Sequence, residues 1–229
     1  VGANAGNSNQ GQSSVAIGNQ AGTNTQGTNS VAIGANAGTS VQGINAVAVG
    51  TFAGFISQQT YATAVGPLAG QLAQSAQAVA FGYLAGQSNQ GSNAVAVGVG
   101  AGITNQANNA ISMGNAAGQF TQSTNAVAIG FQAGQSNQRN NAIAIGAFAG
   151  QLNQSTGSIV INASGVAVNA ATSGLYINPV RQNNANTTNL LSFTPGTGEI
   201  VYTAAKTFVI DHPTDKEKYL VHACLEGPE

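Results

Sequence analysis

The stretch SVAIGANAGTSVQ (residues 30–42) contains the pattern that decides the fold, because the chain repeats it at one fixed spacing. Gly34 closes the motif Val-Ala-Ile-Gly, Gly38 follows four residues later after an alanine, and Gln42 follows four residues after that. The first glycine recurs every 16 residues, at Gly2, Gly18, Gly34, Gly50, Gly66, Gly82, Gly98, Gly114, Gly130 and Gly146. Ten copies therefore run in phase without an insertion.

A strict 16-residue repeat with two glycine turns predicts an all-β fold in which each repeat is one coil of a flattened β-solenoid. Val-Ala-Ile alternates its side chains as a strand does, and the glycines allow turn conformations that other residues resist. A helix is excluded because each glycine in a helix interior costs about 1 kcal/mol. Disorder is excluded because a low-complexity chain has no reason to keep one period, whereas stacked coils must stay in register.

The alternation within Val-Ala-Ile puts Val and Ile on one face of the strand and Ala on the other. We expect Val and Ile to form a thin core inside each coil. The alanine row would then be an apolar strip that should not face water, so we expect it to face identical rows of other subunits. The predicted interface residues are Ala16, Ala32, Ala48, Ala64, Ala80, Ala96, Ala128 and Ala144, with Ser112 in the same row.

Charged residues make up 5% of the chain, against about 25% in an ordinary soluble domain. Arg139 is the only charged residue of the repeats, and the other charges fall between Arg181 and Glu229. So few cations exclude an electrostatic surface for nucleic acid or for an anionic membrane. No apolar run approaches the ~20 residues that span a bilayer. The single cysteine, Cys224, excludes an intrachain disulfide and a cysteine-rich metal site.

The motif Asn-Ser-Val-Ala-Ile-Gly (residues 29–34) resembles the head repeats of bacterial trimeric autotransporter adhesins. The resemblance covers residues 1–162 and implies a left-handed parallel β-roll that assembles as a homotrimer and binds a host surface. The number three comes from this resemblance alone. The 16-residue period is longer than that of the usual adhesin repeat. The half-motif Ala-Gly-x-x-x-Gln looks more like fibre proteins of viruses and phages.

The sequence after Ile161 strengthens the resemblance to viral and phage fibres. GLYINPVR (174–181) and LLSFTPGTGEIVY (190–202) resemble the stretch that precedes the C-terminal chaperone domain of such fibres. KTFVIDHP (206–213) and YLVHACLEGPE (219–229) are similar to the opening of that self-cleaving domain. We therefore expect a solenoid at 1–162, a non-repetitive transition at 163–205, and the start of a chaperone-like domain at 206–229.

The C-terminal segment also holds the residues that invite a catalytic interpretation. His212, His222 and Cys224 include a potential nucleophile and base, but no third orienting group is evident, and a cysteine between Ala and Leu is typical of a small buried hydrophobe. Glu226 and Glu229 lie where the resemblance implies self-cleavage. We predict no catalytic residue, no cofactor and no metal site, and no reaction from the repeats.

Two rows of amides follow the repeat. The glutamines run from Gln10 to Gln154, and we interpret them as a ladder in which stacked amides bond to one another. The asparagines Asn29, Asn45, Asn93, Asn109, Asn125 and Asn141 stand where a turn requires left-handed geometry, which asparagine tolerates. An ice-binding solenoid would need a flat face of matched residues. The positions after each Ala-Gly are unmatched, ranging from Thr23 to Phe55 and Gln71.

The variable turn positions remain as the place for specificity. The aromatic residues among them are candidate receptor contacts. The alternative is that they only pack against neighbouring subunits or coils. These residues are Phe52, Phe55, Tyr83, Phe120, Phe131 and Phe148. Uncharged aromatic and amide groups suit a neutral glycan or a protein surface. The predicted function is a trimeric, extracellular, adhesive fibre of a virion or phage, with the head of a bacterial autotransporter adhesin as the alternative.

Overall fold

The computed structural model of the chain describes residues 2–182, 190–203, 207–211 and 219–223. The chain divides into two compact units, Val1–Pro179 and Val180–Glu229. The described residues form strands, turns and irregular segments, and no helix occurs among them. The first unit is the predicted solenoid, so the all-β, coiled architecture is confirmed.

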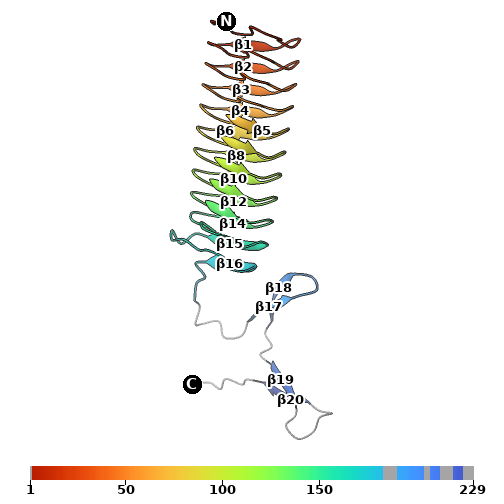
Figure 1. Ribbon diagram of the computed structural model, residues 1–229. Coiled ribbons are helices and arrows are strands. Elements are labelled where there is room, and N and C mark those ends of the chain that lie inside the picture. The colour runs from red at the N-terminus through yellow and green to blue at the C-terminus, as the bar shows by residue number, and fades with distance from the viewer. Residues whose placement is uncertain (1, 183–189, 204–206, 212–218, 224–229) are drawn as a thin grey trace. The chain divides into compact units, whose positions relative to one another are not determined.

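One long parallel sheet runs along the whole first unit, and Figure 1 shows its strands stacked one per coil. Each strand pairs with the residues that lie 16 positions further along the chain, as in Val15 with Val31. The strands, in spatial order, are β1 (Val15–Ile17), β2 (Val31–Ile33), β3 (Val47–Val49), β4 (Thr63–Val65), β6 (Val79–Phe81), β8 (Val95–Val97), β10 (Ile111–Met113), β12 (Val127–Ile129), β14 (Ile143–Ile145), β15 (Ser158–Asn162) and β16 (Gly174–Asn178).

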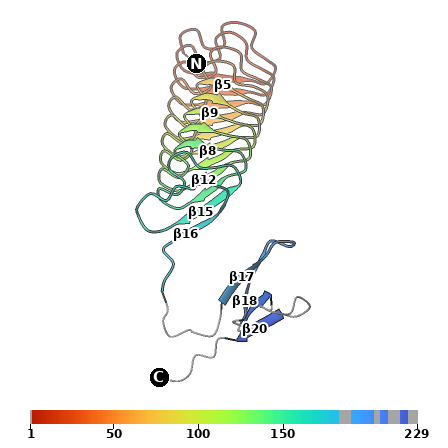
Figure 2. The same cartoon turned by 60° about the horizontal axis from the view of Figure 1, so that its bottom comes forward.

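A second parallel sheet lies on the other side of five successive coils (Figure 2). Isolated bridges extend the same pairing toward the N-terminus, for example between Gln26 and Gln42. Its strands are β5 (Leu72–Gln74), β7 (Ser88–Gln90), β9 (Thr104–Gln106), β11 (Phe120–Gln122) and β13 (Ser136–Gln138). These five coils each have two short strands, as predicted, whereas in the coils nearer the N-terminus isolated bridges take the place of the second strand.

The two turns of the coil explain why glycine recurs at one position of the repeat and asparagine at another. Gly98 has a φ of 126°, and a Cβ added to it would lie 2.6 Å from the carbonyl oxygen of Gly114 in the next coil. A side chain at this position would collide with backbone, so only glycine allows the coils to stack closely. Asn93 and Asn109 adopt a φ of 58° at the other turn, which confirms the left-handed role predicted for the asparagine row.

The alanine row lies inside the coil, so the prediction that it forms a subunit interface is wrong. Ala16 is half-buried at the N-terminal coil, and the remaining members have no exposed surface in the single chain. These fully buried members of the predicted interface are Ala32, Ala48, Ala64, Ala80, Ala96, Ala128 and Ala144, together with Ser112. A surface that one chain already covers offers nothing for a partner to bury.

The physical reason is the narrow interior of the coil. A Cβ added to Gly54 would lie 2.7 Å from Gln58 Oε1 and 3.2 Å from Ala48 Cβ. The interior therefore has no room for even one additional methyl group beside the glutamine. Val and Ile are too large for this space, so the strand turns its alanine inward and presents its branched side chains outward.

The solenoid also extends beyond residue 162, where we expected it to end. β15 and β16 continue the long sheet in the same register, with Ser158 paired to Gly174. Asn162 replaces the turn glycine, and its Nδ2 donates hydrogen bonds to the carbonyls of Ala147 and Val166, both at 2.7 Å. Val160 and Tyr176 take the inward position that alanine holds elsewhere, so larger side chains occupy the interior at this end.

The second unit contains two antiparallel hairpins. β17 (Leu190–Thr194) pairs with β18 (Glu199–Thr203), and β19 (Thr207–Asp211) pairs with β20 (Tyr219–Ala223). His222 stands opposite Phe208 in the backbone register. His212, Cys224, Glu226 and Glu229 lie outside the described residues. The assignments made for residues 206–229 therefore stay predictions.

Candidate functional site

The glutamine row is an interior ladder, as predicted. From Gln42 onward each side-chain Nε2 donates to the Oε1 of the glutamine 16 residues later, at 2.9–3.1 Å. Gln90 shows the full pattern: its Nε2 also donates to the Val79 carbonyl at 2.7 Å, and its Oε1 accepts from Gln74. Gln90 has no exposed surface. The ladder therefore joins the two sheets and the successive coils, and it is closed to external ligands.

The turn asparagines form a second, exposed ladder along part of the rod. Asn109 Nδ2 donates to Asn125 Oδ1 at 3.2 Å, and Asn125 Nδ2 donates to Asn141 Oδ1 at 3.1 Å. On the second sheet, Asn89 bonds Asn105 and Asn137 bonds Asn153 in the same way. Amide ladders thus lie on the surface as well as in the interior.

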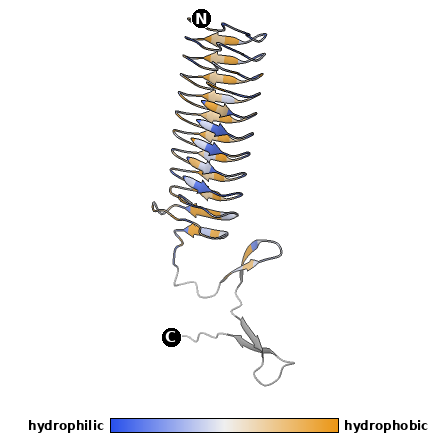
Figure 3. Ribbon diagram, viewed as in Figure 1, coloured by the Kyte–Doolittle hydropathy of each residue, from blue (hydrophilic) through white to orange (hydrophobic). Residues whose placement is uncertain are grey.

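The outward residues of the long sheet form two largely apolar rows, which we call the apolar face. Figure 3 shows these strands predominantly in the hydrophobic colour. The most exposed member of the rows is Phe81, whose side chain is 55% exposed, and its neighbours Val79 and Val97 are half-buried. The apolar face consists of Val15, Ile17, Val31, Ile33, Val47, Val49, Thr63, Val65, Val79, Phe81, Val95, Val97, Ile111, Met113, Val127, Ile129, Ile143, Ile145, Ile159, Ile161, Leu175 and Ile177. A continuous apolar strip of this kind marks an interaction surface.

The candidate receptor aromatics do not gather into one patch. Phe52 and Phe55 pack edge to face with ring centroids 5.1 Å apart, and Phe131 and Phe148 pack in the same way at 5.1 Å. Phe52, Phe55 and Phe148 are half-buried. Two residues stand apart from these pairs: Tyr83, which is 48% exposed, and Phe120, which is 44% exposed. The structure therefore offers two aromatic pairs five coils apart rather than a single aromatic site.

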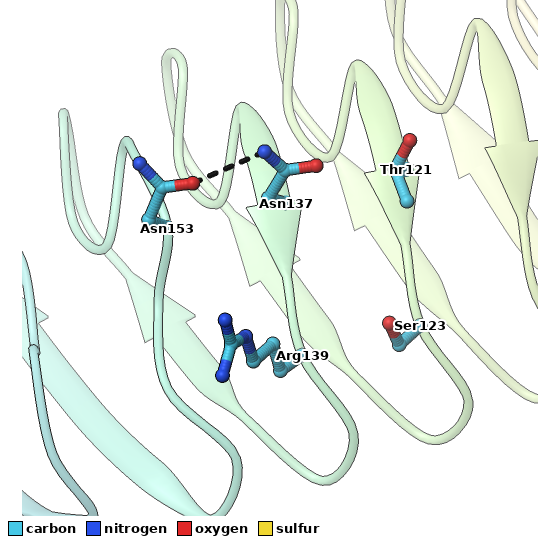
Figure 4. A pocket seen from close by; sticks show the side chains of 5 residues that line it. All are labelled: Thr121, Ser123, Asn137, Arg139 and Asn153. Atoms are coloured by element: carbon cyan, nitrogen blue, oxygen red, sulfur yellow. Dashed lines mark hydrogen bonds between the residues drawn. The ribbon is translucent and has the colours of Figure 1, made fainter.

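A polar depression lies over the second sheet, and the residue types of the repeat did not predict it. Its volume is about 250 Å³, and it is lined by Thr121, Ser123, Asn137, Arg139 and Asn153. Figure 4 shows Asn137 and Asn153 on neighbouring coils, joined by their hydrogen bond, and Arg139 on the same coil as Asn137. The one signal of it in the sequence is Arg139, the single charged residue of the repeats.

Other classes of site find no support in the part of the chain that the structure describes. No group of three or more His, Cys, Asp or Glu side chains is placed there to hold a metal ion. No helix with the length and apolar character needed to cross a lipid bilayer occurs there either.

Comparison with protein families identifies two copies of the YadA head domain repeat, at residues 10–37 and 26–53. The two copies are offset by one 16-residue coil, so the similarity follows the repeat that builds the solenoid. This part of the chain is therefore similar to the head of a trimeric autotransporter adhesin. No curated protein and no solved structure matches the chain significantly.

Proposed function

We propose that the chain is the head or shaft of a homotrimeric, extracellular adhesin-type fibre whose subunits meet through the apolar face. The observation that carries this proposal is the outward position of the branched side chains on every strand of the long sheet. Ten intervals of ~4.8 Å between eleven strands make this strip about 48 Å long. It contains no charged residue, and burying it against other subunits would remove it from water.

The geometry of the strip suits a parallel, in-register assembly. All strands of the long sheet run in the same direction and repeat at one interval, so identical chains standing side by side would match row for row. The number of subunits, three, comes from the similarity of the repeats to the YadA head. Symmetric closure around an axis would cover the strip on each chain.

The repeat similarity supports two origins equally. A bacterial surface would make the chain an autotransporter adhesin head, and a virion surface would make it a fibre. Our preference for a viral or phage fibre rests on the resemblance of residues 206–229 to a self-cleaving chaperone domain. Reading the gene distinguishes them, because an autotransporter would also encode a coiled-coil stalk and a membrane anchor.

Sedimentation of a charged variant tests the interface. Val97→Glu combined with Ile129→Glu would place carboxylates within the apolar face, where burial without a partner is costly. The matched control is Ser88→Glu combined with Thr104→Glu, which adds the same charge to the second sheet. We expect the control to sediment as a trimer and the test variant as a monomer. A monomeric wild type, or a trimeric test variant, would show that the apolar face is not the interface.

We further propose that the fibre attaches to a host glycan or protein through its aromatic turn residues. Phe52→Ser, Phe55→Ser and Tyr83→Ser together should reduce surface attachment while leaving the β-signal in circular dichroism unchanged. Phe131→Ser with Phe148→Ser provides the matched test of the second aromatic pair. Undiminished attachment by both variants would place the receptor site elsewhere.

A further inference from the structure

We propose that the depression around Arg139 is a binding site for a carboxylate-bearing saccharide. Three successive coils supply its lining. Thr121 and Ser123 come from β11 and the residue after it, Asn137 and Arg139 come from β13 and the residue after it, and Asn153 comes from the next coil. The site lies within one chain and on the sheet opposite the apolar face, so it does not depend on the proposed self-association.

Arg139 is an exception within the repeat. The equivalent positions hold small or neutral residues: Gly11, Gly27, Gly43, Gln59, Ser75, Gly91, Ala107, Ser123 and Ser155. The backbone N–H of Arg139 donates to the Gln154 carbonyl at 3.1 Å, as the repeat requires, so the guanidinium itself has no structural duty in the coil.

The charge of Arg139 is not neutralised by its own unit. Residues 1–198 contain no Asp or Glu, and Arg139 is the only charged side chain before Arg181. The side chain is exposed, and the structure gives its guanidinium no hydrogen bond or ion pair among the described residues. A planar guanidinium presents paired donors that match the two oxygens of a carboxylate. An external anion of that shape would therefore fit the guanidinium.

The rest of the lining indicates what carries the carboxylate. Asn137 Nδ2 donates to Asn153 Oδ1 at 3.0 Å. The Asn153 Nδ2 remains as a donor and the Asn137 Oδ1 as an acceptor for a ligand. The hydroxyls of Thr121 and Ser123 add donors and acceptors on the neighbouring coil. No aromatic or aliphatic side chain lines the depression. Such a surface fits a hydroxyl-rich ligand, and its volume of about 250 Å³ suits a single sugar unit better than a drug-sized molecule.

Nuclear magnetic resonance of the arginine side chains tests the site in the full chain. The chain has only two arginines, Arg139 and Arg181, so its Nε–Hε region contains one signal from the site and one internal control. The probes are glucuronate, glucose, which lacks the carboxylate, and acetate, which lacks the sugar. We expect glucuronate to shift the Arg139 signal and not that of Arg181, and to bind at least about tenfold more tightly than either glucose or acetate.

Substitutions complete the test. Arg139→Gln should weaken glucuronate binding about tenfold, which corresponds to about 1.4 kcal/mol, and Gln59 shows that a coil accepts glutamine at this position. Arg139→Lys, which keeps the charge and loses the planar fork, should also weaken it. Arg181→Gln is the matched control and should change nothing. Equal shifts of both arginines, undiminished binding by Arg139→Gln, or acetate binding as tightly as glucuronate would overturn the proposal.

Discussion

Gly98→Ala tests whether close stacking of the coils depends on the turn glycine. The added Cβ would lie 2.6 Å from the Gly114 carbonyl oxygen and 2.8 Å from the Gly114 carbonyl carbon. Both atoms are backbone, so no side chain can rotate away. The coils would have to separate by roughly 0.8 Å to reach an ordinary contact, because carbon atoms pack at about 3.5 Å.

Two costs follow from that geometry. The φ of 126° at Gly98 is a conformation that alanine adopts at a cost of about 1–3 kcal/mol. Separation of the coils would also lengthen the bond that the Gly114 N–H donates to the Val97 carbonyl, now 2.8 Å, and the loss of such a buried bond costs about 1–3 kcal/mol. We expect Gly98→Ala to destabilise the solenoid by about 2–6 kcal/mol, the sum of the two costs. At about 2–4 °C per kcal/mol, the melting temperature should fall by about 4–24 °C.

Gly157→Ala is the matched control. Gly157 also has a positive φ, of 64°, but a Cβ added to it would meet no atom within 4 Å. Only the left-handed backbone then opposes alanine, at about 1–2 kcal/mol. Thermal unfolding followed by circular dichroism, at one chain concentration for all variants, compares the two substitutions. Equal melting temperatures for Gly98→Ala and Gly157→Ala would refute the stacking argument.

Three further predictions follow from the interior and from the charge distribution. Gln90→Ala removes two inter-amide bonds, whereas Gln26→Ala removes none, because Gln26 donates only to the Val15 carbonyl. At about 0.5–1.5 kcal/mol per bond, Gln90→Ala should lower the free energy of unfolding in urea by about 1–3 kcal/mol more than Gln26→Ala does. Equal urea midpoints for the two variants would contradict the role of the ladder. Residues 1–179 contain no Asp, Glu, His, Lys or Cys. The urea midpoint for unfolding of the solenoid should therefore be the same at pH 4 and pH 8, and a shift would show that titrating groups of the second unit contribute to its stability. Residues 1–179 expressed alone should give staggered or aggregated rods, because a slip by one coil keeps nearly every contact between chains. We expect the non-repetitive sequence after Lys206 to align the chains, and uniform trimers of residues 1–179 in electron microscopy would contradict that role.

The repeat predicted the architecture because every coil obeys the same local constraints. The spacing of Gly34, Gly38 and Gln42 placed the turns and the amide ladder, and the structure confirms both. The same spacing predicted two short strands per coil, and five successive coils have both. Local residue preferences and stacking register point to the same fold here, so the sequence was sufficient for this part.

The direction in which each strand face points could not be read from hydrophobicity. Alternation defines two faces, but the width of the interior decides which of them is buried, and that width depends on the opposite sheet. One feature of the sequence does distinguish the faces. The outward positions vary from Thr63 to Phe81, whereas the inward row departs from alanine only at Ser112 between residues 16 and 144. A position that accepts such different volumes does not face a tightly packed interior.

Two other features were missed for different reasons. The last coil was excluded because Asn162 replaces the marker glycine, although the 16-residue step from Ser158 to Gly174 continues. The depression around Arg139 was missed because it arises only when three coils stack and bring Thr121 and Asn153 to either side of Arg139. Neither a motif nor a period describes a surface that forms between coils.

The glutamine ladder gives the rod an electrical polarity. Seven amide-to-amide bonds between Gln42 and Gln154 all point the same way, with each Oε1 toward the N-terminus and each Nε2 toward the C-terminus. Amide dipoles of about 3.5 D aligned head to tail add up, as peptide dipoles do in a helix. The ladder ends at the N-terminal side on the Gln42 Oε1, which is buried without a hydrogen-bond partner. A solenoid with almost no charge therefore has a negative pole near its first coils and a positive pole near its last, opposite in sense to an α-helix.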